Sequence, residues 1–401
     1  MRILLVAPMT PAPDAPGAIP RLLHAAVEGL RREHDLTLVV VAGPEPWELE
    51  AADRLEASGV EAHVVRRFEP SGGRERWERR LRLAWWWGVR RVPWRTAWFH
   101  DPGVQRLIDD LTSSREFDVI AVEDNAVGVY RYPEAVPAVL TEHEVRKRRP
   151  RPAAVDLVRM GPRRALASID WQRWPRYHRA TWSRFGMVQA FTERDAEAIA
   201  HAVPALRGHV RVSPFGIDVP RALDPSEEAP GAVLFVGNMT HYPNVDAAVW
   251  LAADVMPRVL ATNPSARLEI VGAAPPPRLR SLAGPAVAVT GPVGDLRPHF
   301  ERTQVMLAPI RVGGGMRMKV LESMAMGKAV VTTPRGAEGL AVDGEEPPLA
   351  VSSDAAGLAR ATGDLLDDDD RRRDLGRRAR AFVERHHGRE AYARRLESVY
   401  R

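Results

Sequence analysis

Short apolar runs alternate along this chain with segments in which apolar residues recur every three to four positions. Residues 3–6 and 233–236 are continuous apolar runs, and 36–42 is apolar except for Thr37. All three have the length expected for strands that are buried on both faces. Between such runs, residues 21–32 and 49–57 have the spacing of helices with one buried face. This alternation of strand and helix predicts an α/β protein with parallel sheets.

The stretch from 309 to 327 combines a glycine loop with the start of a helix. It follows the short apolar run 305–308, and the helical spacing after the loop ends at Gly327. The consecutive glycines of this loop are Gly313, Gly314 and Gly315. Because glycine has no Cβ, a backbone can approach a ligand closely there. A strand, a glycine loop and a helix N-terminus together predict a phosphate site.

Charged side chains follow the same loop. Arg317 and Lys319 add positive charge, and Glu322 lies three residues after Lys319 on nearly the same helix face. A carboxylate in this position can accept hydrogen bonds from the two neighbouring hydroxyls of a ribose. The group therefore predicts a site for a nucleoside diphosphate. A plain glycine turn followed by a solvated Lys–Glu pair is the alternative that these residues alone leave open.

The donor-site motif of glycosyltransferases with the GT-B fold resembles residues 313–333, which read Gly-Gly-Gly-Met-Arg-Met-Lys-Val-Leu-Glu-Ser-Met-Ala-Met-Gly-Lys-Ala-Val-Val-Thr-Thr. The resemblance is to the large retaining group often called glycosyl transferases group 1 or family 4. Further pieces agree in order, at 235–239, 243–246, 290–293 and 336–340. The resemblance spans most of the second half of the chain, and the pieces together are more specific than any one of them.

This resemblance implies two Rossmann-like doubly wound domains that face a cleft, which fits a chain of 401 residues. We place an N-terminal acceptor-side domain at 1–213 and a C-terminal donor domain at 214–380, and expect the terminal helix 381–401 to cross back to the first domain. The implied reaction moves a sugar from a nucleotide diphosphate sugar to a hydroxyl acceptor with retention of anomeric configuration. No cofactor is expected besides this donor, which acts as a co-substrate.

The resemblance also assigns roles to the residues of the glycine loop. Arg317, Lys319 and the amides of the glycines are implied to hold the diphosphate and to stabilise the leaving group, and Glu322 to anchor the ribose. The family commonly has two glutamates eight positions apart. Glu322 matches the second of them, but Gly314 stands at the first position. We infer that Arg317 and Lys319 supply the charge that contacts the phosphates.

Two other loops of the second domain are implied to contact the donor. Gly237 and Asn238 follow the first strand of this domain, where many members of the family have a glycine and then an arginine. The asparagine departs from that pattern and leaves the phosphate charge to the glycine loop. The loop 290–295, which contains Val293, resembles the loop that holds the nucleobase through backbone contacts.

In the first domain, a loop rich in proline and glycine follows the first strand. Gly17 matches the loop glycine of the family, and Arg21 matches a basic residue often found four positions later. The resemblance implies that this loop reaches the donor diphosphate and the acceptor, whereas a loop glycine with a solvated arginine is the alternative. The pattern Gly-x-Gly-x-x-Gly is absent from this loop, which argues against a nicotinamide or flavin site.

His143 follows the predicted strand 138–141, at the edge where sheets of this class carry ligands. It resembles the histidine that many members present to the sugar and the acceptor, and its ordinary pKa near neutrality would let it orient or deprotonate a hydroxyl. Its neighbours Glu142 and Glu144 are candidate acceptor-side residues. A structural histidine at a strand end is the alternative.

Tryptophan and arginine are concentrated in residues 74–99. Such a segment could rest on an anionic membrane, line an apolar acceptor groove, or pack its tryptophans into the N-terminal core. Nucleic-acid binding is a further use of aromatic and basic residues, but no recognisable motif accompanies them, so no nucleic-acid partner is predicted. The net charge of +5 and the pI near 9.8 suit anionic partners in general.

Features that are missing from the sequence limit where the protein is expected to act and which groups it is expected to bind. There is no cysteine, no apolar run long enough for a signal peptide and no stretch approaching a membrane span, so we expect a cytoplasmic protein, with association to a membrane left open. The acidic run 367–370 is followed by arginines and reads as a helix start, so we predict no metal site and metal-independent activity. The acceptor could be a glycan, a lipid-linked sugar or a small natural product.

Two rival functions fit the same architecture. A nucleotide-sugar epimerase would release a free sugar or an isomer without any acceptor. A catalytically silent protein that binds nucleotide sugars or lipids is the second rival, because the first glutamate of the family's pair is missing. Binding without turnover would distinguish the silent protein from a transferase.

Overall fold

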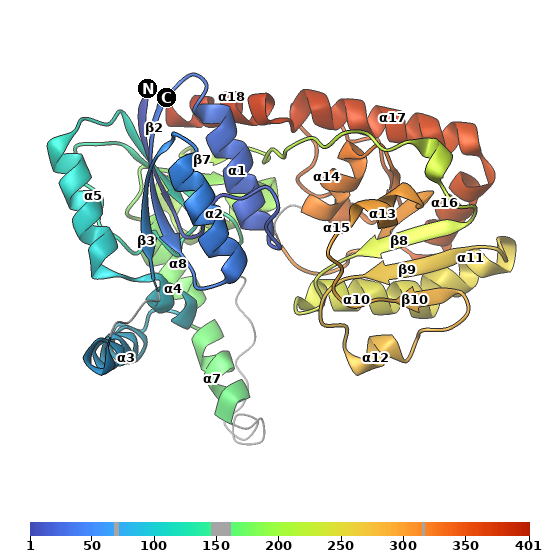
Figure 1. The fold of residues 1–401 in the computed structure, drawn as a ribbon, viewed down its shortest axis with the longest axis horizontal. Coiled ribbons are helices and arrows are strands. Elements are labelled where there is room, and N and C mark those ends of the chain that lie inside the picture. The colour runs from blue at the N-terminus through green and yellow to red at the C-terminus, as the bar shows by residue number, and fades with distance from the viewer. Residues whose placement is uncertain (68–71, 146–161, 315–316) are drawn as a thin grey trace. The chain divides into compact units, whose positions relative to one another are not determined.

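The computed structural model describes residues 1–67, 72–145, 162–314 and 317–401 and, for 162–165, the helical backbone alone. The chain divides into two compact units (Figure 1). The first unit holds Met1–Ser213 together with Tyr392–Arg401, and the second holds Pro214–Ala391. Each unit is built on a parallel β-sheet with helices packed on it.

Within the described residues, the sheet of the first unit has seven strands in the order β3-β2-β1-β4-β5-β6-β7, and every pair is parallel. The strands are β1 (Arg2–Ala7), β2 (Asp35–Ala42), β3 (Glu61–Arg66), β4 (Val119–Glu123), β5 (Ala138–Glu142), β6 (Met187–Ala190) and β7 (Val210–Val212). In register, Ile3 of β1 pairs with Leu36 of β2 and with Val119 of β4. These central strands are almost wholly buried, as expected where helices cover a parallel sheet.

The helices of the first unit are α1 (Ala18–Leu30), α2 (Pro46–Ala57), α3 (Gly73–Gly88), α4 (Trp94–Phe99), α5 (Pro102–Ser114), α7 (Pro162–Trp171), α8 (Trp174–Trp182) and α9 (Glu193–Ala202). Two of them, α1 and α2, overlap the ranges 21–32 and 49–57 predicted from the apolar spacing. Thr192 begins α9 by accepting a hydrogen bond from the backbone N–H of Asp195 at 3.1 Å. Ile108 of α5 and Ile199 of α9 are fully buried in the cluster that covers the sheet.

The sheet of the second unit has six strands among the described residues, in the order β10-β9-β8-β11-β12-β13, and every pair is again parallel. The strands are β8 (Ala232–Val236), β9 (Arg267–Val271), β10 (Val287–Val289), β11 (Val305–Ala308), β12 (Ala329–Thr332) and β13 (Ala350–Val351). The helices are α10 (Tyr242–Trp250), α11 (Met256–Thr262), α12 (Pro277–Arg280), α13 (Arg297–Glu301), α14 (Met318–Ala325), α15 (Pro334–Ala337), α16 (Ala355–Asp367) and α17 (Asp369–His386). A short π-helical segment, Leu251–Val255, joins α10 to α11.

The strand order reverses once in each sheet. In the first unit the reversal lies between β1 and β4, and in the second it lies between β8 and β11. Open parallel sheets bind ligands at the carboxyl ends of the strands beside such a reversal. The predicted fold class, an α/β protein with two doubly wound parallel sheets, is confirmed, and each reversal marks where a site is expected within its own unit.

The terminal segment differs from the single helix that we expected over 381–401. The structure has two helices, α17 and α18 (Arg389–Tyr400), separated at His387 and Gly388. The ring of His387 is buried, with Nδ1 2.8 Å from the carbonyl oxygen of Phe215 and Nε2 3.1 Å from that of Leu340. These contacts come from distant parts of the chain and hold His387 outside helical geometry, so the helix cannot continue.

Candidate functional site

The loops after β8 and β11 flank the reversal of strand order in the second unit. β8 pairs with β9 on one side and with β11 on the other. The loop after β8 begins with Gly237 and Asn238, and the loop after β11 passes through Gly313 and Gly314 to Arg317. Asn244 and Lys319 are 75 positions apart in the sequence. The structure brings the two stretches that carry them to one edge of this sheet.

The backbone comes unusually close to other groups at two glycines of this edge. A Cβ at Gly237 would lie 2.9 Å from Nζ of Lys319 and 3.0 Å from Cγ of Asn244. Gly272, which follows β9, has φ of +152°, and a Cβ there would lie 1.9 Å from the carbonyl oxygen of Gly237. Glycine at 237 therefore leaves room for Lys319 to reach the loop after β8, and glycine at 272 leaves room for the backbone of Gly237.

Lys319 is the second residue of α14, and its half-buried ammonium group joins this helix to the loop after β8. Nζ donates to Oδ1 of Asn244 at 2.6 Å and lies 4.6 Å from the centre of the Phe235 ring. Burial lowers the pKa of Lys319 to about 7, and the charge of Arg317 adds to this effect, whereas Glu322 opposes it. An anion bound beside this group would favour its charged form.

Arg317 is the N-cap residue of α14, with φ of −101° and ψ of 79°, so it belongs to the loop and not to the helix. Its Nη1 donates to the carbonyl oxygen of Gly314 at 2.8 Å. Gly313 has φ of +102°, and a Cβ there would lie 2.9 Å from the ring of Pro243, so glycine is needed. Gly315 lies outside the described residues. The two cations predicted for the phosphates both lie at the start of α14.

The other predicted donor residues of this unit lie on α14 and on two loops. Glu322 is half-buried on α14, and Val293 is half-buried in the loop after β10. Oδ1 of Asn238 accepts hydrogen bonds from the N–H of Thr240 at 3.0 Å and from its hydroxyl at 2.8 Å. The carbonyl oxygen of Asn238 accepts from Nδ2 of Asn244 at 2.7 Å, which connects this loop to Lys319. The asparagine thus braces the loop where many relatives have an arginine.

In the first unit, His143 contacts a buried carboxylate that the sequence analysis did not single out. Glu123 is the last residue of β4 and His143 follows β5, so parallel pairing places them at one edge of the sheet. Nε2 of His143 lies 3.2 Å from Oε2 of Glu123, and the hydroxyl of Thr141 donates to Oε1 at 3.1 Å. Burial lowers the pKa of His143, but the bond to Glu123 and the charge of Asp124 outweigh this effect, so the pKa is raised.

Glu142 and Glu144, the two candidate acceptor-side carboxylates, lie in different environments. Glu142 is 1% exposed, and its oxygens accept from Nδ2 of Asn125 at 2.7 Å and from Nε1 of Trp182 at 2.8 Å. Burial, with the charge of Asp124, raises the pKa of Glu142 to about 8. Glu144 is exposed, and its N–H donates to Oε1 of Glu142 at 3.3 Å. Glu142 therefore positions its neighbours, and Glu144 has the accessible carboxylate.

The loop after β1 reaches α1 at the reversal of the first sheet. Gly17 is the N-cap residue of α1, with φ of −110°, and a Cβ there would meet only Cδ of Pro20 at 3.6 Å. Nε of Arg21 donates to the carbonyl oxygen of Gly17 at 3.3 Å. The local backbone does not require glycine at this position, so any requirement for it would come from a ligand that approaches the loop.

The described parts of the chain hold neither a cluster of metal ligands nor a membrane-spanning helix. Within them, no group of three or more His, Asp or Glu side chains could hold a metal ion. In the acidic run 367–370, Asp368 caps α17 by accepting from the N–H of Arg371 at 2.9 Å. Across the same described residues, no helix combines the length and the apolar character needed to cross a membrane.

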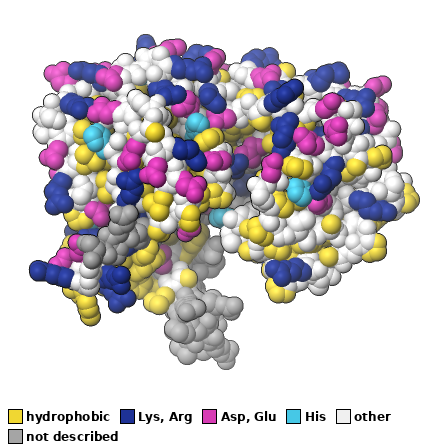
Figure 2. All heavy atoms as spheres, viewed as in Figure 1, with side chains coloured by type: hydrophobic (Ala, Val, Ile, Leu, Met, Phe, Trp, Pro, Cys, Tyr) yellow, Lys and Arg dark blue, Asp and Glu magenta, His cyan; other side chains and the backbone are white. Residues whose placement is uncertain are grey.

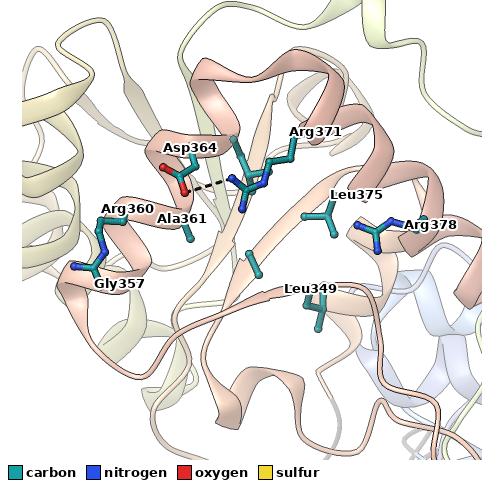
Figure 3. Close-up of a pocket in the computed structure, with 10 residues that line it drawn as sticks. Leu349, Gly357, Arg360, Ala361, Asp364, Arg371, Leu375 and Arg378 are labelled. Atoms are coloured by element: carbon teal, nitrogen blue, oxygen red, sulfur yellow. Dashed lines mark hydrogen bonds and ion pairs between the residues drawn. The ribbon is translucent and has the colours of Figure 1, made fainter.

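A cavity of about 390 Å³ lies elsewhere in the second unit, beside α16 and α17 (Figure 3). Arg360, Arg371 and Arg378 contribute to its lining, and Arg371 pairs with Asp364 at 3.5 Å. It shares no residue with the predicted donor group. The predicted donor group therefore lies apart from this cavity.

Two doubly wound sheets, with a lysine and an arginine at a glycine loop in the second, define an α/β protein of GT-B type. Within that class, residues 230–368 match the family described as Glycosyl transferases group 1. A phosphatidyl-myo-inositol mannosyltransferase of Mycolicibacterium smegmatis is 29% identical over 216 residues, which are 52% of this chain and 55% of that protein. The chain thus spans about half the length of this curated relative. Both matches are to glycosyltransferases.

Solved structures match the whole chain. HepE of Anabaena, crystallised with UDP and glucose, aligns with a TM-score of 0.65 and 13% identity over 99% of both chains. Sucrose-phosphate synthase from Thermosynechococcus elongatus aligns with a TM-score of 0.64 and 17% identity over 100% of this chain and 98% of that one. At such low identity the two matches establish the fold, which is the GT-B arrangement of two parallel α/β sheets.

Proposed function

We propose that this protein is a glycosyltransferase that moves a sugar from a nucleoside diphosphate sugar to an acceptor hydroxyl, with retention at the anomeric carbon. The observation that carries the proposal is the pair of cations, Arg317 and Lys319, at the start of α14, inside the domain matched to group 1. Glycine at 237 and 313 keeps the backbone close to this pair, and α14 adds the positive end of its dipole.

The chemical task of this site is to stabilise charge that develops on the leaving diphosphate. The bond between the anomeric carbon and the β-phosphate oxygen breaks, and the acceptor oxygen forms its bond on the same face of the sugar. The acceptor oxygen itself attacks, so the step needs no protein nucleophile, and the acceptor proton passes to the departing phosphate oxygen. Arg317 and Lys319 donate to the phosphate oxygens as their charge grows, and Glu322 accepts from the ribose hydroxyls.

The lowered pKa of Lys319 fits this task. Near neutral pH, part of the population holds an uncharged lysine, because burial disfavours the ammonium form. A diphosphate brought next to Nζ favours the ammonium form, and the resulting charge lies beside the bond that breaks. Binding of the donor and full charging of Lys319 are therefore coupled events.

On the acceptor side, His143 is proposed to contact the sugar and the acceptor hydroxyl. The carboxylate of Glu123 holds Nε2, so the ring orientation is fixed, and Nδ1 is the nitrogen left to face another group. Glu144 and Arg21 are the further acceptor-side candidates. Glu142 is proposed to act indirectly, through Asn125 and Trp182.

The named relatives suggest which substrates to test first. HepE was crystallised with UDP and glucose, and the mannosyltransferase is named for a phosphatidyl-myo-inositol acceptor. We therefore propose a UDP-sugar as the first donor to try, and a glycan or a lipid-linked sugar as the acceptor. We further propose that the enzyme acts in the cytoplasm and that turnover persists in a metal chelator.

The test begins with thermal unfolding of the protein against UDP, GDP, dTDP and ADP, since a ligand that binds the folded state raises the midpoint. A shift with one diphosphate identifies the base. The matching sugar nucleotides are then incubated with acceptors in chelator, and the product anomer is read by proton NMR. Retention in the product supports the proposal. Inversion, a strict need for a divalent ion, or an isomerised sugar without an acceptor would overturn it.

A further inference from the structure

Helix α3 carries a stripe of large apolar side chains on its exposed side. Trp77, Leu81, Trp85 and Val89 are 64%, 60%, 48% and 67% exposed. Steps of four residues advance by only about 40° around a helix, so these positions share one face. Water-exposed tryptophan at this density is unusual for a helix on the surface of a soluble unit.

The opposite side of α3 is packed against its own unit. Leu83 is buried in a cluster with Val92 and Ala97, and Trp86 and Trp98 pack against the same cluster. The guanidinium of Arg79 lies 4.5 Å from the centre of the Trp98 ring, which fixes this side further. The structure therefore separates the tryptophans of 74–99 into a packed group and an exposed group, which the sequence could not do.

Exposed apolar side chains also occur on α4 and α7, and Asp170 joins α7 to the end of α3 and the start of α4. Oδ1 of Asp170, in α7, accepts hydrogen bonds from Nε1 of Trp87 at 2.9 Å and from the N–H of Trp94 at 2.7 Å. We define the apolar face as Trp77, Leu81, Trp85, Val89, Trp94, Leu166 and Ile169. Of the nine large apolar side chains that are exposed in the described part of the chain, these are seven. Such concentration is typical of an interaction surface.

Positive charge surrounds the same face. Residues 73–99 contain eight arginines and two glutamates, a formal charge of +6, whereas the whole chain carries +5. The arginines are Arg74, Arg76, Arg79, Arg80, Arg82, Arg90, Arg91 and Arg95. Figure 2 shows dark blue basic groups beside yellow apolar ones over α3, at the lower left. The excess positive charge of the protein is thus gathered next to its exposed tryptophans.

We propose that the apolar face docks this protein onto a membrane surface that contains anionic lipids. Tryptophan rings favour the boundary between lipid tails and headgroups, and leucine, isoleucine and valine gain from contact with the tails. Arginine lays its stem along the apolar surface while its guanidinium meets lipid phosphates. The binding needs no sugar nucleotide, so it stands apart from the proposed transferase activity.

Two other occupants fit the same face less well. A symmetric contact with a second copy would bring two charges of about +6 together, which Coulomb repulsion disfavours. Nucleic acid would satisfy the arginines and could stack on tryptophan, but Leu81, Val89, Leu166 and Ile169 would stay exposed to water. A lipid surface satisfies both the charged and the apolar groups.

The experiment is flotation of the full chain with vesicles of phosphatidylcholine alone and of phosphatidylcholine mixed with phosphatidylglycerol. We expect binding to the mixed vesicles that weakens as salt is raised. The variant Trp77→Ser with Trp85→Ser should bind at least about tenfold more weakly. Tyr242→Ser is the matched control, because Tyr242 is 61% exposed in the second unit. It should bind as the unchanged protein does.

The charge is tested separately with Arg76→Glu and Arg80→Glu, both exposed on α3. Losing one basic contact with a negative surface weakens binding about fivefold, so this pair should weaken it by about 25-fold or more. Arg278→Glu with Arg360→Glu, both exposed in the second unit, is the control of equal charge change. Thermal unfolding of each variant checks that the fold is kept.

Several results would overturn the proposal. One is that the unchanged protein fails to float with the mixed vesicles at low salt. Another is that the control variants weaken binding as much as the α3 variants do. Sedimentation that shows a dimer, split by the tryptophan variant, would assign the face to a second copy. Tighter binding to a random duplex than to the vesicles would assign it to nucleic acid. Sugar transfer without vesicle binding would leave the transferase proposal intact.

Discussion

Nζ of Lys319 donates to Oδ1 of Asn244 across 2.6 Å, and this bond ties the start of α14 to the loop after β8. The amide is neutral, so it satisfies one hydrogen of the ammonium group without offsetting its charge. That is why burial can lower the pKa of Lys319 to about 7. A phosphate oxygen would add the negative charge that the amide lacks, and the first two predictions follow from this relationship.

Binding of a nucleoside diphosphate near pH 8 should be accompanied by uptake of a proton. Above its pKa of about 7 the lysine is mostly uncharged, and the bound phosphates raise that pKa. The affinity should fall by up to about tenfold per pH unit as pH rises above 7. Calorimetry in two buffers of different ionisation enthalpy measures the uptake. Lys319→Gln should bind more weakly and without uptake. Identical heats in both buffers for the unchanged protein would contradict the prediction.

Gly237→Ala should weaken diphosphate binding by about tenfold, because the new Cβ would lie 2.9 Å from Nζ of Lys319 and displace it. The free energy of unfolding should fall by about 1–2 kcal/mol from the crowding. Isothermal titration and urea denaturation measure the two effects. Gly284→Ala is the control, since a Cβ at Gly284 meets nothing within 4 Å. Equal affinities for the two variants would show that Gly237 does not shape the site.

Glu123→Gln should move the pH profile of transfer to lower pH. The amide keeps the shape and one hydrogen bond but loses the charge that raises the pKa of His143. The contact of the acceptor hydroxyl with the neutral imidazole would then be complete at lower pH, because the ring loses its proton sooner. The profile of kcat/KM measures the shift, with exposed Glu144→Gln as the control. An unchanged profile would leave His143 with a structural role only.

Glu228→Ala should lower the free energy of unfolding by about 3–5 kcal/mol. Its carboxylate lies 2.9 Å from Nζ of Lys328 and 3.1 Å from Nη2 of Arg372, and these cations are 2% and 3% exposed. Removing the carboxylate leaves buried Lys328 with the carbonyl oxygens of Glu301 and Thr303, and it leaves Arg372 with Asp369. Urea denaturation measures the loss. Asp374→Ala removes an exposed partner of Arg377 and should cost less than about 1 kcal/mol. Similar losses for both variants would argue against the buried network.

The apolar runs of the sequence predicted the central strands well, because a strand buried on both faces must be apolar along its length. The run at residues 3–6 lies inside β1, and the run 305–308 coincides with β11. The ending of α17 at His386 was missed, since the groups that hold His387 are carbonyls of Phe215 and Leu340, far away in the chain. The spacing of apolar residues within a helix does not depend on such distant partners, so it could not predict where this helix ends.

At the donor loop, too, local spacing predicted some features and contacts between distant residues decided others. Glycine, cation and carboxylate along 313–322 act within one strand–loop–helix unit, so their spacing alone predicted a phosphate site. Asn244 had no such signal, because it meets Lys319 only after β8 and β11 pair. In the first unit, parallel pairing of β4 with β5 likewise brings Glu123 to His143.

Composition determined that residues 74–99 are rich in tryptophan and arginine, but not which of them face water. Trp86 packs inward and Trp85 points outward, although they are adjacent in the sequence and equally apolar. A helix turns by about 100° per residue, and the side that packs is decided by the partner that it meets. The sequence by itself therefore determined the fold class and the local loop chemistry. The tertiary structure decided which charges are buried, which side chains pair across strands, and which apolar face is left exposed, because each of these depends on contacts between residues distant in the chain.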